Sequence, residues 1–514
     1  MTQTRSILGL LACSALGLAA CGDTVAATTG PAKVVIPAYD GLPPPKKKPA
    51  AARQSPPSSG ATKESPFPNV ARSKLANGLG VDVVTVKTLP VVHAHVVIKA
   101  GAGYGAVPNL GALTAEMLKD GGTRAMSSAE LLRRVETLGT DLAISARGDS
   151  TTISLKVTKD KLAEGLSLLS QVVREPRFDD GELAKLKKRE ADEVEAALRS
   201  SGSFIAKYAM NHELYGATHP YAMQDALPAD LKKIDRAQVE AHHKKFFVPS
   251  NAVLILAGDI EEAQAKELAQ KSFGSWTGGT APKLDFADPK TPDKTRVIVV
   301  NRAQSAQSDV FVATTGPDRR AKDWAKLKVA NQILGGGVAS RLFADVRETR
   351  SLAYSTSSSI TEYAHGKLPV TLYAGTQMAK TSEAVTGLLE NLDRMRSSPP
   401  TGAETETARR YMSDIFAIYM ETVGSVATLV GTQEVLGLPD RYWDEYRKEL
   451  RGTQAPEAAE AAQKLFGDAR AHSLIVVSGD AAAIAPELSR FGDVTVLDPE
   501  KDFKAVKTIP ASVK

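Results

Sequence analysis

The sequence predicts an α+β fold built from two homologous domains, each an antiparallel-rich sheet with helices packed on one face. Two observations predict it. Segments with alternating apolar residues, typical of strands, stand among longer segments whose apolar residues recur at helical spacing. The order of these segments also repeats along the chain, which indicates that one structural plan occurs twice.

The repeat is visible in two strand ends and one helix. Each feature of the first half has a counterpart about 220 residues later. The pairs are Gly101 with Gly316, Leu168 with Leu388, and Asp259 with Asp480. Prolines cluster among polar residues within 280–295, so we place the boundary there and predict domains at 71–285 and 290–505.

Local patterns predict individual elements of each half. Ser127 followed by Glu130 forms a capping box that opens a helix. The alternation in 151–158 predicts a strand, and the charged segment 181–199 predicts a long helix. The second half has a corresponding long helix at 403–421.

The N-terminus is typical of a bacterial lipoprotein. Arg5 and the apolar segment 7–20 form a signal peptide, predicted over 1–20, that ends at Cys21 in a lipoprotein-type cleavage pattern. A plain signal peptide cut elsewhere is the alternative. Acylation of Cys21 would hold the protein on a membrane. Residues 21–70, rich in Pro, Lys and Ala, then form a disordered tether.

These features place the protein in the bacterial cell envelope, facing the periplasm. Gly22 follows Cys21 where an aspartate would favour retention in the inner membrane, so we favour the outer membrane. The net charge of +5 is small for 514 residues and is spread along the chain, which excludes a nucleic-acid partner. The sequence contains neither a phosphate-binding loop nor a nucleophile elbow.

The segment 335–355 carries the most information about function. Its three glycines, Gly335, Gly336 and Gly337, allow close approach of another chain, and we assign them to substrate binding. A helix with one buried face follows, on whose open face Arg341 and Asp345 can pair. Its apolar positions are Val338, Leu342, Phe343 and Val346.

The same segment places two side chains for a site. The residues 351–360 predict a strand, so Arg347 near the helix end and Tyr354 on the strand can point into one corner. The ordinary alternative is a surface arginine and a half-buried strand tyrosine without a joint role.

This segment resembles the C-terminal half of the pitrilysin/insulinase-type zinc peptidases, the group that includes mitochondrial processing peptidase. The strand within 246–260 and the loop at 219–221 are similar to further parts of that family, and the resemblance extends over 71–500. The family's peptidases carry an H-x-x-E-H zinc motif on the first helix and a further glutamate ligand on a later helix.

The zinc motif is absent from this chain. Ala112 and Glu116 stand where the resemblance places the histidines, and Ala115 stands where it places the general-base glutamate. Glu190, Glu193 and Glu195 fall in the region of the distal ligand, and without partner ligands they form an ordinary solvated helix face. We therefore expect this chain to bind no cofactor and expect zinc on a partner.

The resemblance implies a non-catalytic subunit of a heteromeric zinc endopeptidase. Arg347 and Tyr354 would be catalytic in trans, donating hydrogen bonds to the substrate beside the zinc of a partner that carries H-x-x-E-H. The substrate would be an extended peptide held along a sheet edge.

Two other functions remain open from the sequence. The protein could be an envelope scaffold that binds a peptide or protein and has no role in proteolysis. It could also be a self-sufficient metalloenzyme, since His93 and His95 point to the same side of a strand. Two histidines are fewer ligands than zinc requires, which weighs against that reading.

Overall fold

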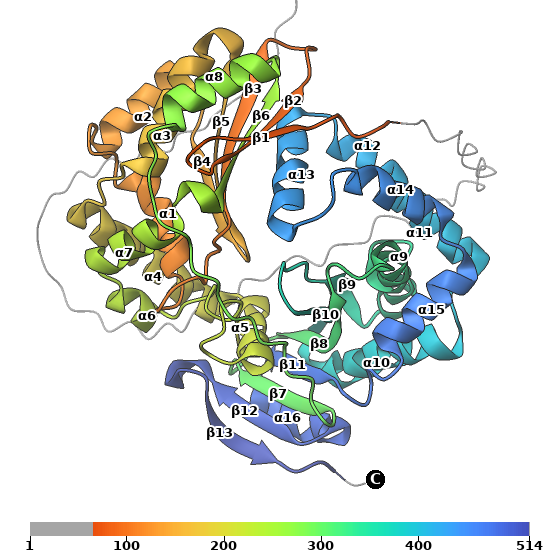
Figure 1. The fold of residues 1–514 in the computed structure, drawn as a ribbon. Helices are drawn as coiled ribbons and strands as arrows, with labels where there is room; N and C mark the ends of the chain where they lie inside the picture. Colours follow the sequence, from red (N-terminus) through yellow and green to blue (C-terminus); the bar gives the residue numbers. More distant parts are fainter. Residues whose placement is uncertain (1–64, 513–514) are drawn as a thin grey trace, which may run out of the picture. The chain divides into compact units, whose positions relative to one another are not determined.

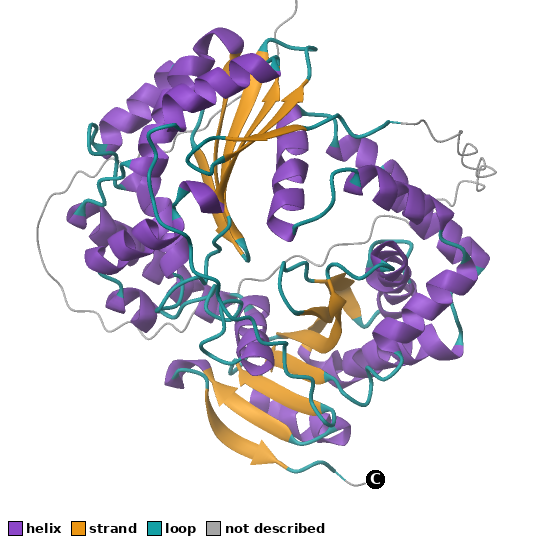
Figure 2. Cartoon of the chain, viewed as in Figure 1, coloured by secondary structure: helices purple, strands orange, loops and turns teal. Residues whose placement is uncertain are grey.

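The computed structural model describes residues 65–512 and contains two sheets with many helices, so the predicted α+β class is confirmed (Figures 1 and 2). The predicted signal peptide, Cys21 and the tether up to residue 64 lie outside the described residues. The final residues of the predicted tether are described. There the Phe67 N–H donates to Oδ1 of Asp444 at 2.8 Å.

The first half contains a six-stranded sheet with the order β1-β2-β6-β3-β5-β4. Its strands are β1 (Ala71–Lys74), β2 (Gly80–Thr85), β3 (Val91–Ile98), β4 (Ala143–Arg147), β5 (Ser150–Thr158) and β6 (Ala252–Gly258). Its helices are α1 (Leu110–Asp120), α2 (Ser128–Thr137), α3 (Leu162–Arg174), α4 (Asp180–Ser200), α5 (Gly202–Tyr215), α6 (Pro228–Lys233), α7 (Arg236–Phe246) and α8 (Glu262–Phe273).

The second half contains a seven-stranded sheet with the order β13-β12-β7-β11-β8-β10-β9. Its strands are β7 (Arg296–Asn301), β8 (Gln307–Asp318), β9 (Ala353–Ile360), β10 (Lys367–Gln377), β11 (Leu474–Gly479), β12 (Val494–Asp498) and β13 (Lys504–Ile509). Its helices are α9 (Trp324–Gly335), the π-helix η3 (Phe343–Thr349), α10 (Thr381–Ser397), α11 (Gly402–Asp414), α12 (Phe416–Tyr419), α13 (Val423–Leu436), α14 (Tyr442–Gly452), α15 (Ala455–Phe466) and α16 (Ala481–Leu488).

The two halves share one strand topology. In the first half β2 pairs parallel with β6, and β6, β3, β5 and β4 then follow in antiparallel pairs. In the second half β7 pairs parallel with β11, and β11, β8, β10 and β9 follow in the same way. This correspondence is what an internal duplication would produce.

Each half also contributes one helix to the opposite half. The second-half helix α13 packs on β3 and β6 of the first sheet, and the first-half helix α5 packs on β8 and β11 of the second sheet. Both helices begin with glycines that touch the opposite sheet. A Cβ on Gly424 would lie 2.7 Å from Cε1 of His93, and one on Gly202 would lie 2.2 Å from Oδ2 of Asp309.

This exchange explains why the central strands are apolar throughout. All residues of β6 and β11 are buried. On β6, Leu254 and Leu256 face the core formed with the first half's own helices, whereas Val253 and Ile255 pack with residues of α13. A strand covered on both faces needs apolar residues at every position.

Several local predictions are confirmed. The capping box is present, since the Ser127 N–H donates to the Glu130 carboxylate at 2.7 Å and the Glu130 N–H donates to Oγ of Ser127. Strand 151–158 corresponds to β5, and helix 181–199 corresponds to α4. The predicted helix 403–421 is interrupted, because α11 ends at Asp414 and α12 is a separate short helix.

Two predictions for the segment after the glycines are wrong. Val338 is 76% exposed, whereas Leu342 and Val346 are fully buried. Arg341 does not pair with Asp345. Instead its Nε lies 2.7 Å from Oε1 of Glu404 on α11. The long-range partner prevails because the Arg341 guanidinium also donates to backbone carbonyls at the end of α10 and just after it, which hold it beside α11.

A search of residues 65–512 finds no single helix long and apolar enough to cross a membrane. One bent pair passes by length and composition, formed by Gly402–Tyr419 with Val423–Leu436 at an angle of 116°.

Candidate functional site

The helix that corresponds to the zinc helix is α1. Ala112 lies at the wall of a cavity, and Ala115 is buried. Neither side chain has an atom that can bind a metal. Among the described residues, no three His, Cys, Asp or Glu side chains are grouped as metal ligands. The side chains at this position therefore do not fit the zinc that the family resemblance implies.

Acidic groups and one arginine occupy the space between α1 and α4. Burial raises the pKa of Glu116, and the nearby carboxylates of Asp120 and Glu190 raise it further. Burial also raises the pKa of Glu190. Arg189 donates to Oδ2 of Asp120 at 3.1 Å, so a guanidinium partly neutralises this cluster. Glu190 on α4 thus lies near enough to Glu116 on α1 for its charge to act on that carboxyl group.

The three glycines differ in their surroundings. Gly335 is buried at the end of α9, and a Cβ there would lie 2.3 Å from the backbone nitrogen of Ser358 on β9. Gly335 therefore permits close contact between helix and strand within this chain. Gly336 and Gly337 are exposed and remain accessible to another molecule.

Arg347 and Tyr354 lie side by side at the surface. Cζ of Arg347 is 5.2 Å from the centre of the Tyr354 ring and 4.6 Å from the centre of the Phe343 ring. The Tyr354 side chain is 84% exposed, and Arg347 Nε lies 3.5 Å from Oε1 of Glu348. The sequence prediction that helix and strand would bring Arg347 and Tyr354 into one corner agrees with this contact.

The π-helix η3 sets the position of Arg347. The backbone N–H of Arg350 donates to the carbonyl of Asp345 at 2.9 Å, which gives this turn one residue more than an α-helical turn. The Asp345 carboxylate accepts a hydrogen bond from Nδ2 of Asn391 at 2.7 Å and forms ion pairs with Arg350 and Arg394. Bonds to the neighbouring helix α10 thus hold the wide turn from which Arg347 projects.

A cavity of about 930 Å³ lies near α1, and both halves of the chain contribute to it. The hairpin β4–β5 and α13 line it, together with Ala112, Asp225 and Glu362. Strand β4 is the last strand of its sheet and pairs only with β5, so its outer edge has free backbone groups. Such an edge can accept an additional extended chain.

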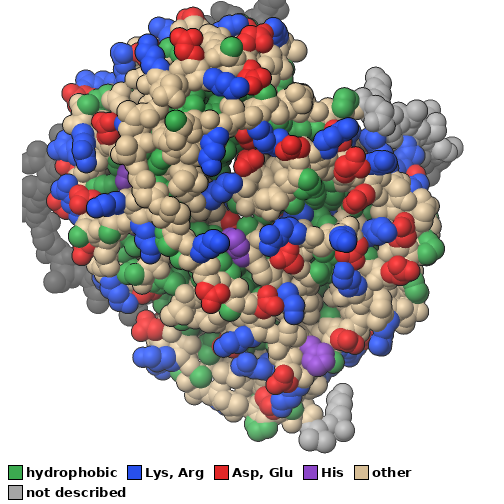
Figure 3. Space-filling model, viewed as in Figure 1, with side chains coloured by type: hydrophobic (Ala, Val, Ile, Leu, Met, Phe, Trp, Pro, Cys, Tyr) green, Lys and Arg blue, Asp and Glu red, His purple; other side chains and the backbone are tan. Residues whose placement is uncertain are grey.

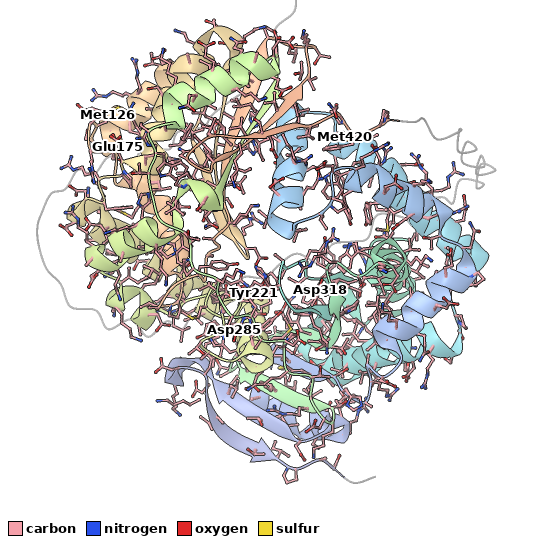
Figure 4. All side chains as sticks on the ribbon, viewed as in Figure 1. Met126, Glu175, Tyr221, Asp285, Asp318 and Met420 are labelled. Atoms are coloured by element: carbon pink, nitrogen blue, oxygen red, sulfur yellow. The ribbon has the colours of Figure 1, made fainter. Side chains whose placement is uncertain are left out.

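A buried network of tyrosines around Asp149 connects the halves. The hydroxyls of Tyr104 and Tyr221 donate to Oδ1 of Asp149 at 3.1 and 2.7 Å, and the N–H of Ala364 donates to Oδ2 at 2.8 Å. The Tyr221 ring stacks on Tyr363 with a centroid distance of 3.7 Å. Tyr221 thus lies where first-half and second-half segments meet (Figure 4).

Burial and the Asp149 carboxylate raise the pKa of both Tyr104 and Tyr221, so both hydroxyls keep their protons and donate. Burial raises the pKa of Tyr363 to about 12. Sequence reasoning missed this network because its members come from distant segments. The only local signal was the turn that contains Gly148 and Asp149 between two strands.

His93 and His95 contact each other rather than a group of further ligands. Their Nδ1 and Nε2 atoms are 2.8 Å apart. Burial lowers the pKa of His93, and burial lowers that of His95 to about 3, so both rings are neutral. One tautomer of each ring satisfies this hydrogen bond. The contact between His93 and Gly424 gives the pair a packing role against α13.

Comparison with known proteins identifies the family. A model described as "Insulinase (Peptidase family M16)" matches residues 83–216, and one described as "Peptidase M16 inactive domain" matches residues 233–412. The chain is 24% identical over 360 residues to "Uncharacterized zinc protease YmxG" of Bacillus subtilis, covering 70% of this chain and 86% of that protein. It is 22% identical over 364 residues to "Non-peptidase homolog YmxG" of Helicobacter pylori, covering 68% and 81%.

A solved structure shows the same architecture. The peptidase M16 inactive domain from Pseudomonas fluorescens superposes with a TM-score of 0.74 at 25% sequence identity, covering 80% of this chain and 98% of that chain. The family models match parts of both halves, and the resemblance read from the segment 335–355 is confirmed. The chain belongs to the insulinase family of peptidases, family M16, as a degenerate member without the zinc motif.

Proposed function

We propose that this protein is the non-catalytic subunit of a heteromeric zinc endopeptidase and binds the peptide substrate. One observation carries the proposal: Arg347 and Tyr354 form an exposed pair of hydrogen-bond donors in a chain whose α1 lacks the zinc ligands. Surface donors of this kind can act on a bound substrate if another chain brings zinc opposite them.

The chemistry of the pair suits the stabilisation of an oxyanion. The Arg347 guanidinium stays charged and presents several N–H donors, and the Tyr354 hydroxyl adds a neutral donor on a rigid ring. During hydrolysis of a peptide bond, negative charge develops on the carbonyl oxygen, and Arg347 and Tyr354 would donate hydrogen bonds to that oxygen. A donor that meets this charge contributes about 3–4 kcal/mol to the barrier reduction.

The substrate in this proposal is an extended peptide. The outer edge of β4 is unpaired in the described chain, and it borders the cavity into which Ala112 points. Edge addition forms main-chain hydrogen bonds and therefore does not require one particular sequence. The exposed Gly336 and Gly337 would let such a peptide approach the loop before η3 closely.

The partner is a homologous chain with an intact H-x-x-E-H motif. It would supply zinc, which activates water and polarises the carbonyl when bound. The name of the Helicobacter relative as a non-peptidase homologue supports a degenerate role for chains of this type.

Purification of the tagged protein from its own membranes tests the proposal directly. We expect a homologous H-x-x-E-H chain to co-purify with about one zinc per pair, and we expect each chain alone to be inactive on an unfolded peptide. Failure of any such chain to co-purify, or full peptidase activity of the partner without this protein, would contradict the proposal.

We further propose that the protein is a periplasm-facing lipoprotein of the cell envelope, anchored at Cys21 and located in the outer membrane. Metabolic labelling with a fatty acid, followed by membrane fractionation, tests this. Cys21→Ser should abolish the label and release the protein into the periplasm. A labelled Cys21→Ser protein would contradict the assignment.

A peptide-binding envelope scaffold is the second candidate. The cavity of about 930 Å³ favours it, because a single chain already encloses a space beside a free strand edge. This candidate predicts peptide binding by the isolated protein and no homologous partner. An adjacent reading frame with H-x-x-E-H would favour the peptidase subunit instead.

A further inference from the structure

A second large groove lies on the first half and is not used by the proposed function. It has a volume of about 1180 Å³ and is formed by α3, α7 and the segments around 175–178 and 275–279. None of its lining residues lines the cavity beside β4. Glu175, one of its lining residues, lies on the side of the first half away from the second half (Figure 4).

The groove is cationic. We call it the cationic groove, and its basic side chains are Arg124, Arg174, Arg177, Arg236, Lys244 and Lys245. Only two carboxylates, Glu175 and Glu240, line it. On the face shown in Figure 3, by contrast, basic and acidic side chains are intermixed.

Half of these cations have no carboxylate partner. Arg236 pairs with Glu240 and Asp180, and Arg177 pairs with Asp179. In contrast, no Asp or Glu of residues 65–512 lies within 4.0 Å of the charged nitrogens of Arg124, Lys244 or Lys245. Three uncompensated positive charges in a concave site attract an anion more strongly than the same charges on an open surface.

The floor and one rim of the cationic groove indicate which kind of anionic ligand it can bind. Phe178, Phe247 and Trp276 form the floor but are at most 4% exposed, so the groove offers no aromatic platform on which nucleic-acid bases could stack. On the rim, the N–H groups of Thr277, Gly278 and Gly279 donate no hydrogen bond within the described part of the chain. Exposed backbone donors of this kind suit the carbonyls of an extended polypeptide.

We propose that the cationic groove binds an extended, Glu- and Asp-rich segment of another protein. Carboxylates of the segment would pair with Arg124, Lys244 and Lys245, and its backbone would meet the 277–279 rim. A flat anionic bilayer fits less well, because Arg174 lies within the groove with 18% of its side chain exposed and hydrogen-bonds to Ser272 and Ser275.

The test measures binding of a fluorescent Glu-Ser repeat peptide of about twelve residues to the full-length protein in detergent, with the corresponding Gln-Ser peptide as control. We expect binding of the acidic peptide alone, weakening as salt rises because the charges are screened. The groove variant, which combines Lys244→Gln, Lys245→Gln and Arg124→Gln, should bind the acidic peptide about tenfold or more weakly.

Matched controls separate a local effect from net charge and from unfolding. Lys185→Gln/Lys188→Gln with Arg199→Gln removes the same three charges from exposed residues on α4 outside the groove and should leave binding unchanged. Circular dichroism should show equal thermal stability of all variants. Equal binding of the two peptides would overturn the proposal. Unchanged binding of the acidic peptide by the groove variant would also overturn it. The proposal would likewise be wrong if the acidic peptide did not bind at all, while anionic vesicles bound the unchanged protein and not the groove variant.

Discussion

The guanidinium carbon of Arg347 lies 5.2 Å from the centre of the Tyr354 ring, and Arg347 projects from a π-helical turn that Asp345 holds. The contact joins a π-helix to the edge strand β9. Because the tyrosine is 84% exposed, the pair contributes little to the stability of the isolated chain and is available to another molecule.

Arg347→Ala should therefore lower the activity of the reconstituted pair without lowering stability. We expect kcat to fall about 100-fold, corresponding to roughly 3 kcal/mol, because a donor to the developing oxyanion is lost. Arg347→Lys retains charge but not the fork of donors and should recover only part of the rate. Steady-state kinetics of the reconstituted pair measure kcat. An unchanged kcat would show that Arg347 does not act on the transition state.

Tyr354→Phe tests the second donor. It keeps the ring over which the Arg347 guanidinium lies and removes only the hydroxyl. We expect kcat to fall about tenfold or more, while KM and the thermal midpoint stay nearly constant. A change confined to KM would mean that Tyr354 binds substrate uniformly and does not stabilise the transition state.

Asp82 should make the stability depend on pH. Burial raises its pKa from 3.8 to about 7, assisted by Glu434 and opposed by Arg72 and Lys99. The folded state thus holds a proton that the unfolded state loses between these values. The contribution of this group to the free energy of unfolding therefore falls as pH rises from about 4 to 7 and stays level above.

Asp82→Asn should remove this effect. Relative to the unchanged protein, we expect the variant to gain on the order of 2–4 kcal/mol at pH 8 and little at pH 4. Urea unfolding across this range measures the difference. Asp192→Asn on the exposed face of α4 is the control. A difference between the Asp82 variant and the unchanged protein that does not vary with pH would contradict the prediction.

Gly335→Ala should destabilise the second half. Its Cβ would meet the Ser358 backbone nitrogen at 2.3 Å, so α9 and β9 would have to separate. We expect a loss of about 2–4 kcal/mol in the free energy of unfolding. Gly337→Ala is the matched control, because the nearest atom to its added Cβ is Nε2 of Gln332 at 3.6 Å, an ordinary contact distance. Equal stability of the two variants would show that β9 can shift.

Asp149→Asn tests the connection between the halves. One carboxylate oxygen accepts from two tyrosines and the other accepts from the Ala364 N–H, and an amide cannot satisfy all three donors. We expect a loss of about 2–4 kcal/mol and faster proteolysis in the segment 280–295. Glu213→Gln, at a partly exposed ion pair with Arg296, should change either quantity far less.

Much of the fold was predictable because its signals are local. The capping box at Ser127, the alternation in β5 and the repeat of strand ends each depend on residues a few positions apart, and the repeat adds a second copy of the same pattern. The corner between Arg347 and Tyr354 was predictable for the same reason, since seven residues separate them.

Predictions failed where a distant segment supplied the partner. Arg341 pairs with Glu404 because α11 lies beside it, and the helix predicted over 403–421 breaks near Ile415, where α12 turns the chain towards α13. Neither outcome can be predicted from the residues of a single helix or strand, because side-chain pairing between helices depends on how the helices pack.

Residue types and short spacings were enough to predict the family, the doubled plan, the loss of the zinc motif at Ala112, Ala115 and Glu116, and the closeness of Arg347 to Tyr354. Only the tertiary structure decided which helix covers which sheet, that Asp149 joins the halves, that Asp82 is buried among charges and that basic residues from separate segments form one groove. The physical reason is that burial and electrostatic environment arise from contacts between segments far apart in the chain, which local pattern does not specify.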